Sequence, residues 1–226
     1  AQVAKMGSSI QNLSNGRLEL GIGAGWYSGE HEMFGVNLPE TKERLNLLEE
    51  YIQILKGLWN KDDFSFQGVH HRIEKASMNP KPISNIPIIV GGMASRTIDI
   101  SVRCGDEWNG YYLTHEKLKK KLSLILELEK KYEKSIKKTI MVPFVIGDSA
   151  EKILNHLKKC NMVFANLPTD INEWKKMGYL GGIPEQMVEQ IETYKAMGID
   201  HIILEHLDIE NDLAIDDLNG KVLTKL

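Results

Sequence analysis

The sequence predicts an α/β fold with a parallel sheet. Five short apolar runs alternate along the chain with amphipathic helical segments. The runs show little polar alternation, which is typical of strands buried on both faces. The chain has 226 residues, of which 42% are hydrophobic and 26% charged, an ordinary composition for a globular protein. We therefore expect a single α/β domain over residues 1–226, with helices covering a parallel sheet.

Each apolar run is followed by a segment with helical spacing. The expected strands lie in RLELGIGAG (17–25), IPIIVGG (86–92), DEWNGYY (106–112), TIMVPFVIG (139–147) and IDHIILEH (199–206). The expected helices cover 41–59, 95–105, 115–135, 149–160 and 182–198. The first of these places Leu45, Leu48, Ile52, Leu55 and Trp59 on one face. Ser95 and Ser149 stand at N-cap positions, and Pro184 stands in a first helical turn.

Two stretches interrupt this alternation and predict insertions on loops. The first, at about 60–80, has a hairpin pattern around Gly68. The second, 161–182, combines irregular sequence with short helical pieces. No Ser-, Gly- or Pro-rich linker separates these stretches from the rest, so one domain remains the simpler interpretation.

Composition excludes several classes of partner. A net charge of -3 offers no basic footprint for nucleic acid, and no apolar run reaches the roughly 18 residues of a membrane span. Two cysteines, Cys104 and Cys160, are too few for a disulfide scaffold or a metal cluster, so a reducing cytoplasm is expected. The chain does not begin with Met, which suggests a piece of a longer protein.

The run LELGIGAGW (18–26) carries the first candidate site. Gly21, Gly23 and Gly25 are spaced by two and share one face of a strand, and Trp26 stands where a dinucleotide-binding loop needs its third glycine. The next helix is expected only from Thr41, which also argues against a dinucleotide loop. A strand with a bare face favours a planar cofactor lying against the backbone, and close packing without any ligand is the alternative.

A second glycine pair follows the next strand. In IIVGGMASRT (88–97), Gly91 and Gly92 lead into a helix whose first turn carries Ser95, Arg96 and Thr97. Unpaired N–H groups at a helix start favour a phosphate, and Arg96 could add a charged fork. A simple cap and tight turn is the alternative. The loop LGGIPEQ (180–186) has the same glycine pattern without a nearby cation.

Six ordered segments of the chain resemble the luciferase-like flavin and deazaflavin oxidoreductases, and among them the coenzyme F420-dependent subgroup. The matching segments are LSNGRLELGIGAGW (13–26), EHEMFGV (30–36), ERLNLLEEYIQILKGLW (43–59), FSFQGVHHRIEKASMNPKPI (64–83), PIIVGGMASRTIDISVRCGDEWN (87–109) and GIPEQMVEQIETYKAMGIDHIIL (182–204). The resemblance covers nearly the whole chain in the right order.

The family fold is a (β/α)8 TIM barrel, so the resemblance implies an incomplete one here. The five expected strands resemble strands four to eight, and the first three strands are missing. Such barrels need eight strands and usually about 250 residues. We therefore expect exposed sheet edges that pair with another chain, as a homo-oligomer or with a separate N-terminal half. The same reasoning predicts weak catalysis or none from this chain alone.

The resemblance also assigns a cofactor and its contacts. Coenzyme F420 is expected, with FMN as the alternative, in a hydride transfer to or from a small organic substrate that the sequence does not identify. Ala24 and Gly25 would lie beside the cofactor ring. The residues implied along its ribityl and phosphate arm are Gly91, Gly92, Met93, Ala94, Ser95 and Arg96. Trp26, Trp108 and Asn109 would stand around the same mouth, although each tryptophan could equally be ordinary core.

Candidate catalytic residues are fewer. Glu30 and His31 follow the first glycine run closely enough to serve as acid, base or substrate contacts, with an exposed loop pair as the alternative. His70 and His71 are adjacent in an expected strand and would point to opposite faces, so we predict no metal site. A noncatalytic remnant or interaction module, in which the glycines serve only packing, is the alternative to the enzyme.

Overall fold

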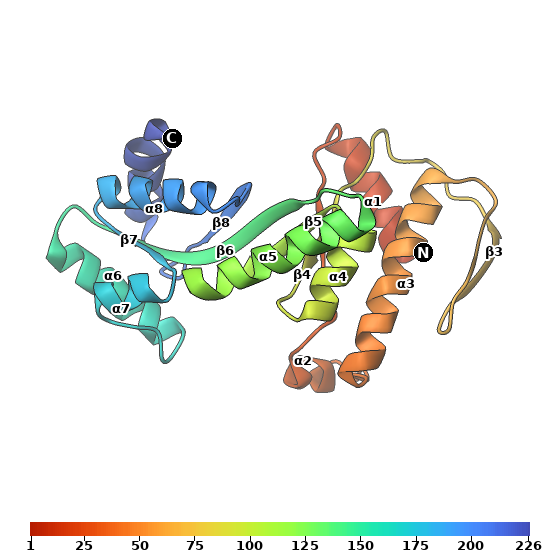
Figure 1. The fold of residues 1–226 in the computed structure, drawn as a ribbon, viewed down its shortest axis with the longest axis horizontal. Helices are drawn as coiled ribbons and strands as arrows, with labels where there is room; N and C mark the ends of the chain where they lie inside the picture. Colours follow the sequence, from red (N-terminus) through yellow and green to blue (C-terminus); the bar gives the residue numbers. More distant parts are fainter. The chain divides into compact units, whose positions relative to one another are not determined.

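The computed structural model describes residues 1–226, which form two compact units. Unit 1 comprises residues 1–108 and 127–136, and unit 2 comprises residues 109–126 and 137–226. Figure 1 labels most of the elements and colours the chain from the N-terminus (red) to the C-terminus (blue). Strand β5 (Glu107–Tyr111) and helix α5 (His115–Tyr132) are divided between the two units.

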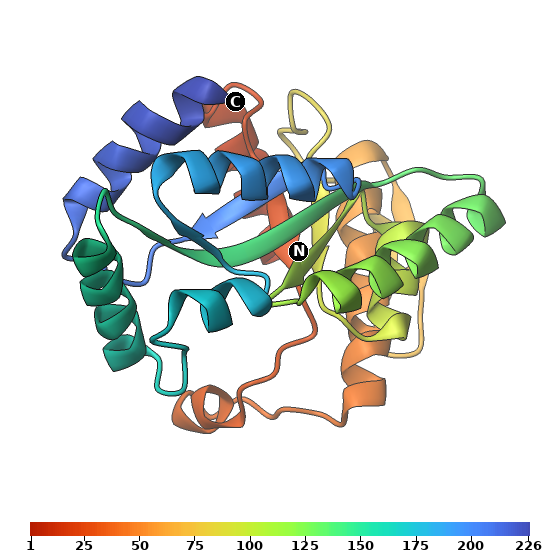
Figure 2. The same ribbon diagram turned by 60° about the vertical axis from the view of Figure 1, so that its left-hand side comes forward.

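Unit 1 contains a parallel strand pair with helices packed against it. Its helices are α1 (Gln2–Leu13), α2 (Ser28–Met33), α3 (Thr41–Asn60) and α4 (Ser95–Cys104). Its strands are β1 (Leu20–Ile22), β2 (Phe64–Gln67), β3 (Arg72–Ala76) and β4 (Ile88–Gly91). β1 runs parallel to β4, with Gly21 opposite Ile89. α3 and α4 lie side by side (Figure 1 and Figure 2).

The apolar stripe expected on α3 forms much of the unit 1 core. All five of its residues are buried, namely Leu45, Leu48, Ile52, Leu55 and Trp59. They pack with Ile88 and Val90 of β4 in one apolar cluster. The indole N–H of Trp59 donates to the carbonyl oxygen of Ala4 at 2.9 Å, which ties α1 to α3. The helical spacing in the sequence is therefore confirmed as a buried face.

The hairpin expected around Gly68 is present. β2 and β3 pair antiparallel, with Gln67 opposite Arg72. β2 docks on α3 at Gly57, where an added Cβ would lie 2.1 Å from the ring of Phe64. Only glycine lets the hairpin approach the helix this closely. The first insertion therefore packs directly on α3.

Unit 2 is built on the long strand β6. Its strands are β6 (Lys137–Ile146), β7 (Leu180–Gly182) and β8 (His201–Glu205). Its helical segments are α6 (Ala150–Val163), α7 (Ile171–Lys176), α8 (Pro184–Ala196), α9 (Asp212–Asp217), η1 (Leu218–Val222) and η2 (Leu223–Lys225). β6 runs parallel to both other strands, with Phe144 opposite Leu180 and Val142 opposite Leu204. Figure 2 shows β6 crossing the unit beside β8.

The five expected strands correspond to β1, β4, β5, β6 and β8, and parallel pairing confirms the α/β class. Ser149 caps α6 by accepting a hydrogen bond from the backbone N–H of Lys152. Pro184 is the first residue of α8, as predicted. None of the helices combines the length and the apolar composition needed to cross a membrane.

The helix expected from Thr41 is α3, but an additional short helix of six residues, α2, stands between β1 and α3. Three other local expectations were wrong. Ala94, with extended backbone, is the N-cap of α4, so Ser95 is its first helical residue rather than its cap. The stretch expected as a loop at 180–186 contains β7. α6 runs to Val163, into the second insertion.

Candidate functional site

Two glycine-containing segments lie next to each other in unit 1. β1 and β4 are parallel neighbours, and Ile22 stands opposite Val90. The residues that follow each strand therefore emerge at the same edge of the pair. In α/β proteins the carboxyl ends of parallel strands are where ligands bind. This edge brings together the two loops that the sequence singles out.

The glycines leave a bare surface on this strand pair. An added Cβ at Gly21 would have no heavy atom within 4 Å, and Gly21 is exposed. At Gly23 it would lie 3.5 Å from the carbonyl oxygen of Gly91, and at Gly91 it would lie 3.8 Å from that of Ile22. The space beside Gly21 is therefore open within 4 Å, and a flat group can approach the backbone there.

Gly92 shapes the loop between β4 and α4. Its φ is +145°, and an added Cβ would lie 2.7 Å from Cγ2 of Thr97. The indole N–H of Trp108 donates to the Gly92 carbonyl oxygen at 2.7 Å. Trp108 is 0% exposed, so it is a core residue, and its hydrogen bond ties the Gly92 loop to the core. This matches the alternative in which Trp108 is ordinary core.

The start of α4 presents backbone donors to the same edge. No side chain caps α4, and its first turn holds no acidic residue. The N–H groups in the first turn of a helix have no partner within the helix. Ala94, Ser95 and Arg96 are exposed, and Met93 is partly buried. The Arg96 guanidinium donates to the Asn46 side-chain oxygen and, at 3.4 Å, to the Lys42 carbonyl oxygen, which draws it toward α3.

The loop after β1 contains the remaining predicted residues of unit 1. Gly25 has a φ of +75°, and its Cβ position is 3.6 Å from Nε2 of His31. His31 Nδ1 lies 3.0 Å from the carbonyl oxygen of Tyr27. Ala24 is partly buried, whereas Trp26 is 84% exposed with its ring 5.3 Å from that of Tyr27. Glu30 is exposed on α2.

A small cavity opens beside this loop. It measures about 110 Å³, and His31, Arg44 and Tyr51 line it together with Gly23 and Ala24. The Nε atom of Arg44 is buried without a hydrogen-bond partner. Sequence reasoning missed Arg44 and Tyr51. Their spacing of seven residues, which places both on one side of α3 just after the glycine run, is the signal that could have found them.

The hairpin loop is locked to α3 beside this cavity. The Glu50 carboxylate accepts hydrogen bonds from the backbone N–H of Val69 at 2.6 Å and of His71 at 3.1 Å. It also lies 2.9 Å from Nδ1 of His71, whose ring is 4.8 Å from that of Tyr51. Burial raises the pKa of Glu50, but hydrogen bonds from His71, His70 and Val69 outweigh burial and lower it. The hairpin therefore fixes the position of one cavity wall.

Two further residues singled out in the sequence, His70 and Asn109, do not line this cavity. His70 Nδ1 is 4.0 Å from a carboxylate oxygen of Glu43, so the adjacent histidines face two different carboxylates of α3. Asn109 follows Trp108 in β5 but belongs to unit 2. Its Nδ2 is buried without a hydrogen-bond partner.

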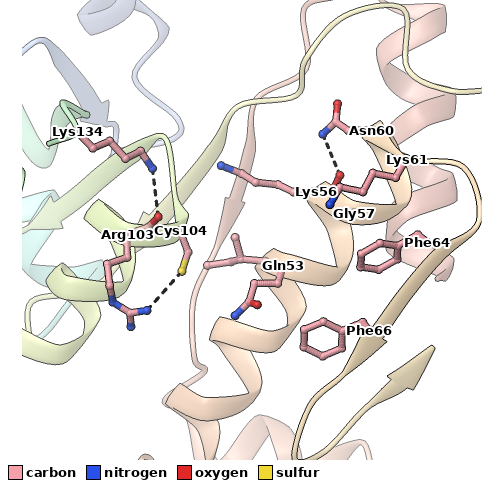
Figure 3. Close-up of a pocket in the computed structure, with 11 residues that line it drawn as sticks. Gln53, Lys56, Gly57, Asn60, Lys61, Phe64, Phe66, Arg103, Cys104 and Lys134 are labelled. Atoms are coloured by element: carbon pink, nitrogen blue, oxygen red, sulfur yellow. Dashed lines mark hydrogen bonds between the residues drawn. The ribbon is translucent and has the colours of Figure 1, made fainter. Parts of the chain in front are cut away.

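A larger cavity lies at the far end of α4 from the glycine loop (Figure 3). It measures about 470 Å³ and contains none of the predicted site residues. Figure 3 shows the phenyl rings of Phe64 and Phe66 on the hairpin side and Cys104 on the opposite side. Lys134 donates to the backbone carbonyl of Gly105, which satisfies the end of α4. Burial raises the pKa of the Cys104 thiol, so this cysteine is a poor nucleophile.

Comparison with known proteins gives the family. The profile described as luciferase-like monooxygenase matches residues 1–182. The chain belongs to this family. An FMNH2-dependent dimethylsulfone monooxygenase from Pseudomonas fluorescens is 25% identical over 246 residues, covering 94% of this chain and 66% of that enzyme. An F420-dependent glucose-6-phosphate dehydrogenase from Amycolatopsis mediterranei is 22% identical over 250 residues, covering 100% of this chain and 74% of that enzyme.

Solved structures confirm the fold of this luciferase-like protein. An F420-dependent secondary alcohol dehydrogenase in complex with an F420–acetone adduct superposes with a TM-score of 0.80 at 19% identity, covering 98% of this chain and 73% of that chain. The coenzyme F420-dependent tetrahydromethanopterin reductase from Methanopyrus kandleri gives 0.79 at 14% identity, covering 99% and 78%. The chain thus has the fold of luciferase-like TIM barrels and spans 66% to 78% of the length of these relatives.

Proposed function

We propose that this luciferase-like protein is an oxidoreductase that binds coenzyme F420 along the loops after β1 and β4. The observation that carries the proposal is the pairing of a bare glycine surface with an uncapped helix start at one strand edge. A tricyclic ring needs a flat, side-chain-free approach. A phosphate needs backbone N–H donors, and the first turn of α4 offers them without a competing acid.

The residues fit the two ends of such a cofactor. Ala24 and Gly25 would lie beside the ring, with Trp26 at its rim. The arm would run along 91–95, and Arg96 could leave Asn46 to reach a phosphate oxygen. The bound cofactor would supply the hydride chemistry, while the protein orients it and excludes water. Glu30 and His31 stand at the same loop as candidate acid, base or substrate contacts.

FMN is the second candidate cofactor, and a specific observation supports it. The FMNH2-dependent relative covers 94% of this chain at 25% identity, whereas the F420-dependent relative is 22% identical. The likeness to the F420-dependent subgroup is strongest in LGIGAGWYSGEHEMFGV (20–36) and FSFQGVHH (64–71). We favour F420 because these two segments form the loop after β1 and the hairpin beside its cavity.

A fluorescence titration tests the cofactor. The protein is titrated with oxidised F420 and, separately, with FMN. We expect saturable binding of F420 that is tighter than that of FMN. Tighter binding of FMN would favour the monooxygenase alternative. Absence of binding by either cofactor, to this chain and to a version extended to the relatives' full length, would overturn the enzyme proposal in favour of the noncatalytic module.

We further propose that unit 1 pairs with another chain, a second copy or a separate N-terminal half. β1 pairs with β4 on one side and ends the strand order on the other. Beside it, α1 exposes four apolar side chains, namely Val3 (51%), Met6 (62%), Ile10 (46%) and Leu13 (88%). An exposed edge and a contiguous apolar face are typical of an interaction surface. Light scattering after gel filtration checks this: a strictly monomeric species at micromolar concentration would contradict self-association.

A further inference from the structure

A polar cavity lies in unit 2 between α6 and the helical segment that follows β8. It measures about 400 Å³. Gly147 and Asp148, at the carboxyl end of β6, form one wall, and α9 and η1 supply another. His156 of α6 and Asp208, three residues beyond β8, also line it. The cavity thus stands at the carboxyl ends of two parallel neighbours, β6 and β8, which is a common place for ligands.

Buried polar atoms without partners lie on two lining residues, His156 and Asp208, and on His206 beside them. The side-chain atoms Nε2 of His156, Oδ2 of Asp208, and Nδ1 and Nε2 of His206 are buried and make no hydrogen bond. His156 is 2% exposed and Asp208 is 6% exposed. The rings of His156 and His206 are 5.9 Å apart, and Phe144 stacks on His206 at 5.4 Å. Because buried polar groups are nearly always paired, this cluster indicates a group that supplies the missing partners.

The contacts that His156 and Asp208 already make indicate what kind of partner their unpaired atoms lack. His156 Nδ1 lies 3.2 Å from the backbone nitrogen of Ile146 and 3.4 Å from its carbonyl oxygen, so it accepts from the first or donates to the second, according to the tautomer. Burial lowers the pKa of His156, which favours the neutral ring. Nε2 has no partner in either tautomer. Asp208 Oδ2 is an acceptor whose cation, Lys159 Nζ, stands at 3.6 Å, beyond hydrogen-bond distance. The missing partner must therefore pair with His156 Nε2 and donate to Asp208.

The charges on the cavity wall cancel. Each of its three lysines faces an aspartate, in the pairs Lys152–Asp148 at 2.8 Å, Lys159–Asp208 at 3.6 Å and Lys221–Asp217 at 2.6 Å. The three aspartates would repel a phosphate or carboxylate, and the three lysines would repel a cation. The wall therefore favours an uncharged ligand. The amide side chains of Asn155 and Asn211 line the same cavity and offer further donors and acceptors.

We propose that this cavity binds a small uncharged compound carrying several hydroxyl groups, a sugar or polyol. A hydroxyl both accepts and donates, so hydroxyl groups can pair with His156 Nε2 in either tautomer and donate to Asp208 Oδ2. Further hydroxyls along the carbon chain would pair with the asparagine amides and the rim ion pairs. A volume of about 400 Å³ accommodates a molecule of monosaccharide size. The site lies wholly in unit 2 and does not depend on the cofactor proposed for unit 1.

Nuclear magnetic resonance on the ¹⁵N-labelled chain tests this, with D-glucose and sorbitol as probes. We expect saturable shifts confined to the backbone amides of Gly147 and His156 and the side-chain amides of Asn155 and Asn211. Asp208→Asn keeps the shape of the side chain but removes the carboxylate, so binding should weaken about tenfold or more. The matched control is Glu173→Gln, which removes an exposed ion pair with Lys176 elsewhere in unit 2 and should leave binding unchanged.

Three results would overturn the proposal. The first is an absence of saturable shifts with both probes, which would leave ordered water as the partner of the unpaired atoms. The second is equal weakening by Asp208→Asn and Glu173→Gln. The third is a response to zinc chloride alone, which would identify the two histidines and Asp208 as metal ligands. If Asp208→Asn changes the whole spectrum, His156→Asn replaces it, with the same weakening expected. Because no readout involves F420 or FMN, failure here is distinct from failure of the proposed function.

Discussion

The Glu50 carboxylate on α3 and the His71 ring on the hairpin are joined at 2.9 Å, between Oε2 and Nδ1. The same carboxylate accepts hydrogen bonds from the backbone N–H groups of Val69, His70 and His71. Gly68 leaves room for the carboxylate in this position, because an added Cβ would lie 2.5 Å from it. A single acid thus anchors the hairpin insertion to α3, which lines the small cavity beside the loop after β1.

Replacing this acid should loosen the hairpin. Glu50→Gln keeps the size of the side chain but turns one acceptor oxygen into a donor that faces backbone N–H groups. We expect a loss of about 1–3 kcal/mol in the free energy of unfolding, measured in urea. Glu74→Gln is the control, because Glu74 pairs with Arg72 on an exposed surface and should change stability by less than about 0.5 kcal/mol. Equal effects of the two changes would refute the anchoring role.

The same carboxylate predicts a pH dependence. Burial raises the pKa of Glu50, but the hydrogen bonds from His71, His70 and Val69 outweigh it and hold the folded pKa below the ordinary value of a glutamate. A depressed carboxyl pKa stabilises the fold above the unfolded value, and this stabilisation is lost as pH falls through the folded value. Stability of the natural chain should therefore fall more steeply below about pH 4.5 than that of Glu50→Gln. Urea midpoints between pH 3 and 6 check this, and parallel profiles of the two proteins would contradict it.

The strands could be predicted because short apolar runs between helical segments are a local signal. Burial on both faces holds for most of β6 but not for β1 and β8, which contain exposed residues. α2 could not be predicted, because its six residues bury no side chain and so carry no amphipathic pattern. β7 was missed because Leu-Gly-Gly has neither length nor alternation. Its three residues are buried through pairing with β6, which the local sequence does not encode.

Some residues of the candidate site could likewise be predicted from the sequence, and others could not. Gly91 and Gly92 could be found because the absence of a side chain is itself visible in sequence. The function of Glu50 could not, because a glutamate in an amphipathic helix is usually on the solvated face. Arg44 and Tyr51 reach the cavity only through the way α3 packs on β1. The buried place of Trp108 under Gly92 likewise depends on tertiary packing.

The neighbouring glycines at the end of β4, Gly91 and Gly92, should separate binding from folding. At Gly91 an added Cβ meets only a carbonyl oxygen at 3.8 Å, so Gly91→Ala should leave the unfolding free energy within about 0.5 kcal/mol. The methyl group would still stand on the edge proposed for the cofactor, so F420 affinity should fall about tenfold. Gly92→Ala should destabilise by about 1–3 kcal/mol, since its φ is +145° and its Cβ would lie 2.7 Å from Thr97. Unchanged F420 binding by Gly91→Ala would place the cofactor elsewhere.

Two buried tryptophans provide a matched test of the loop. Trp108→Phe removes the N–H that donates to Gly92 at 2.7 Å, and Trp59→Phe removes the one that donates to Ala4 at 2.9 Å. Each change leaves a carbonyl without its buried partner and should cost about 1–3 kcal/mol in urea unfolding. Only Trp108 holds the loop proposed to carry the cofactor arm, so only Trp108→Phe should also weaken F420 binding, by about three- to tenfold. If both variants weaken binding equally, the loss reflects general destabilisation, and Trp108 has no particular part in positioning the Gly92 loop.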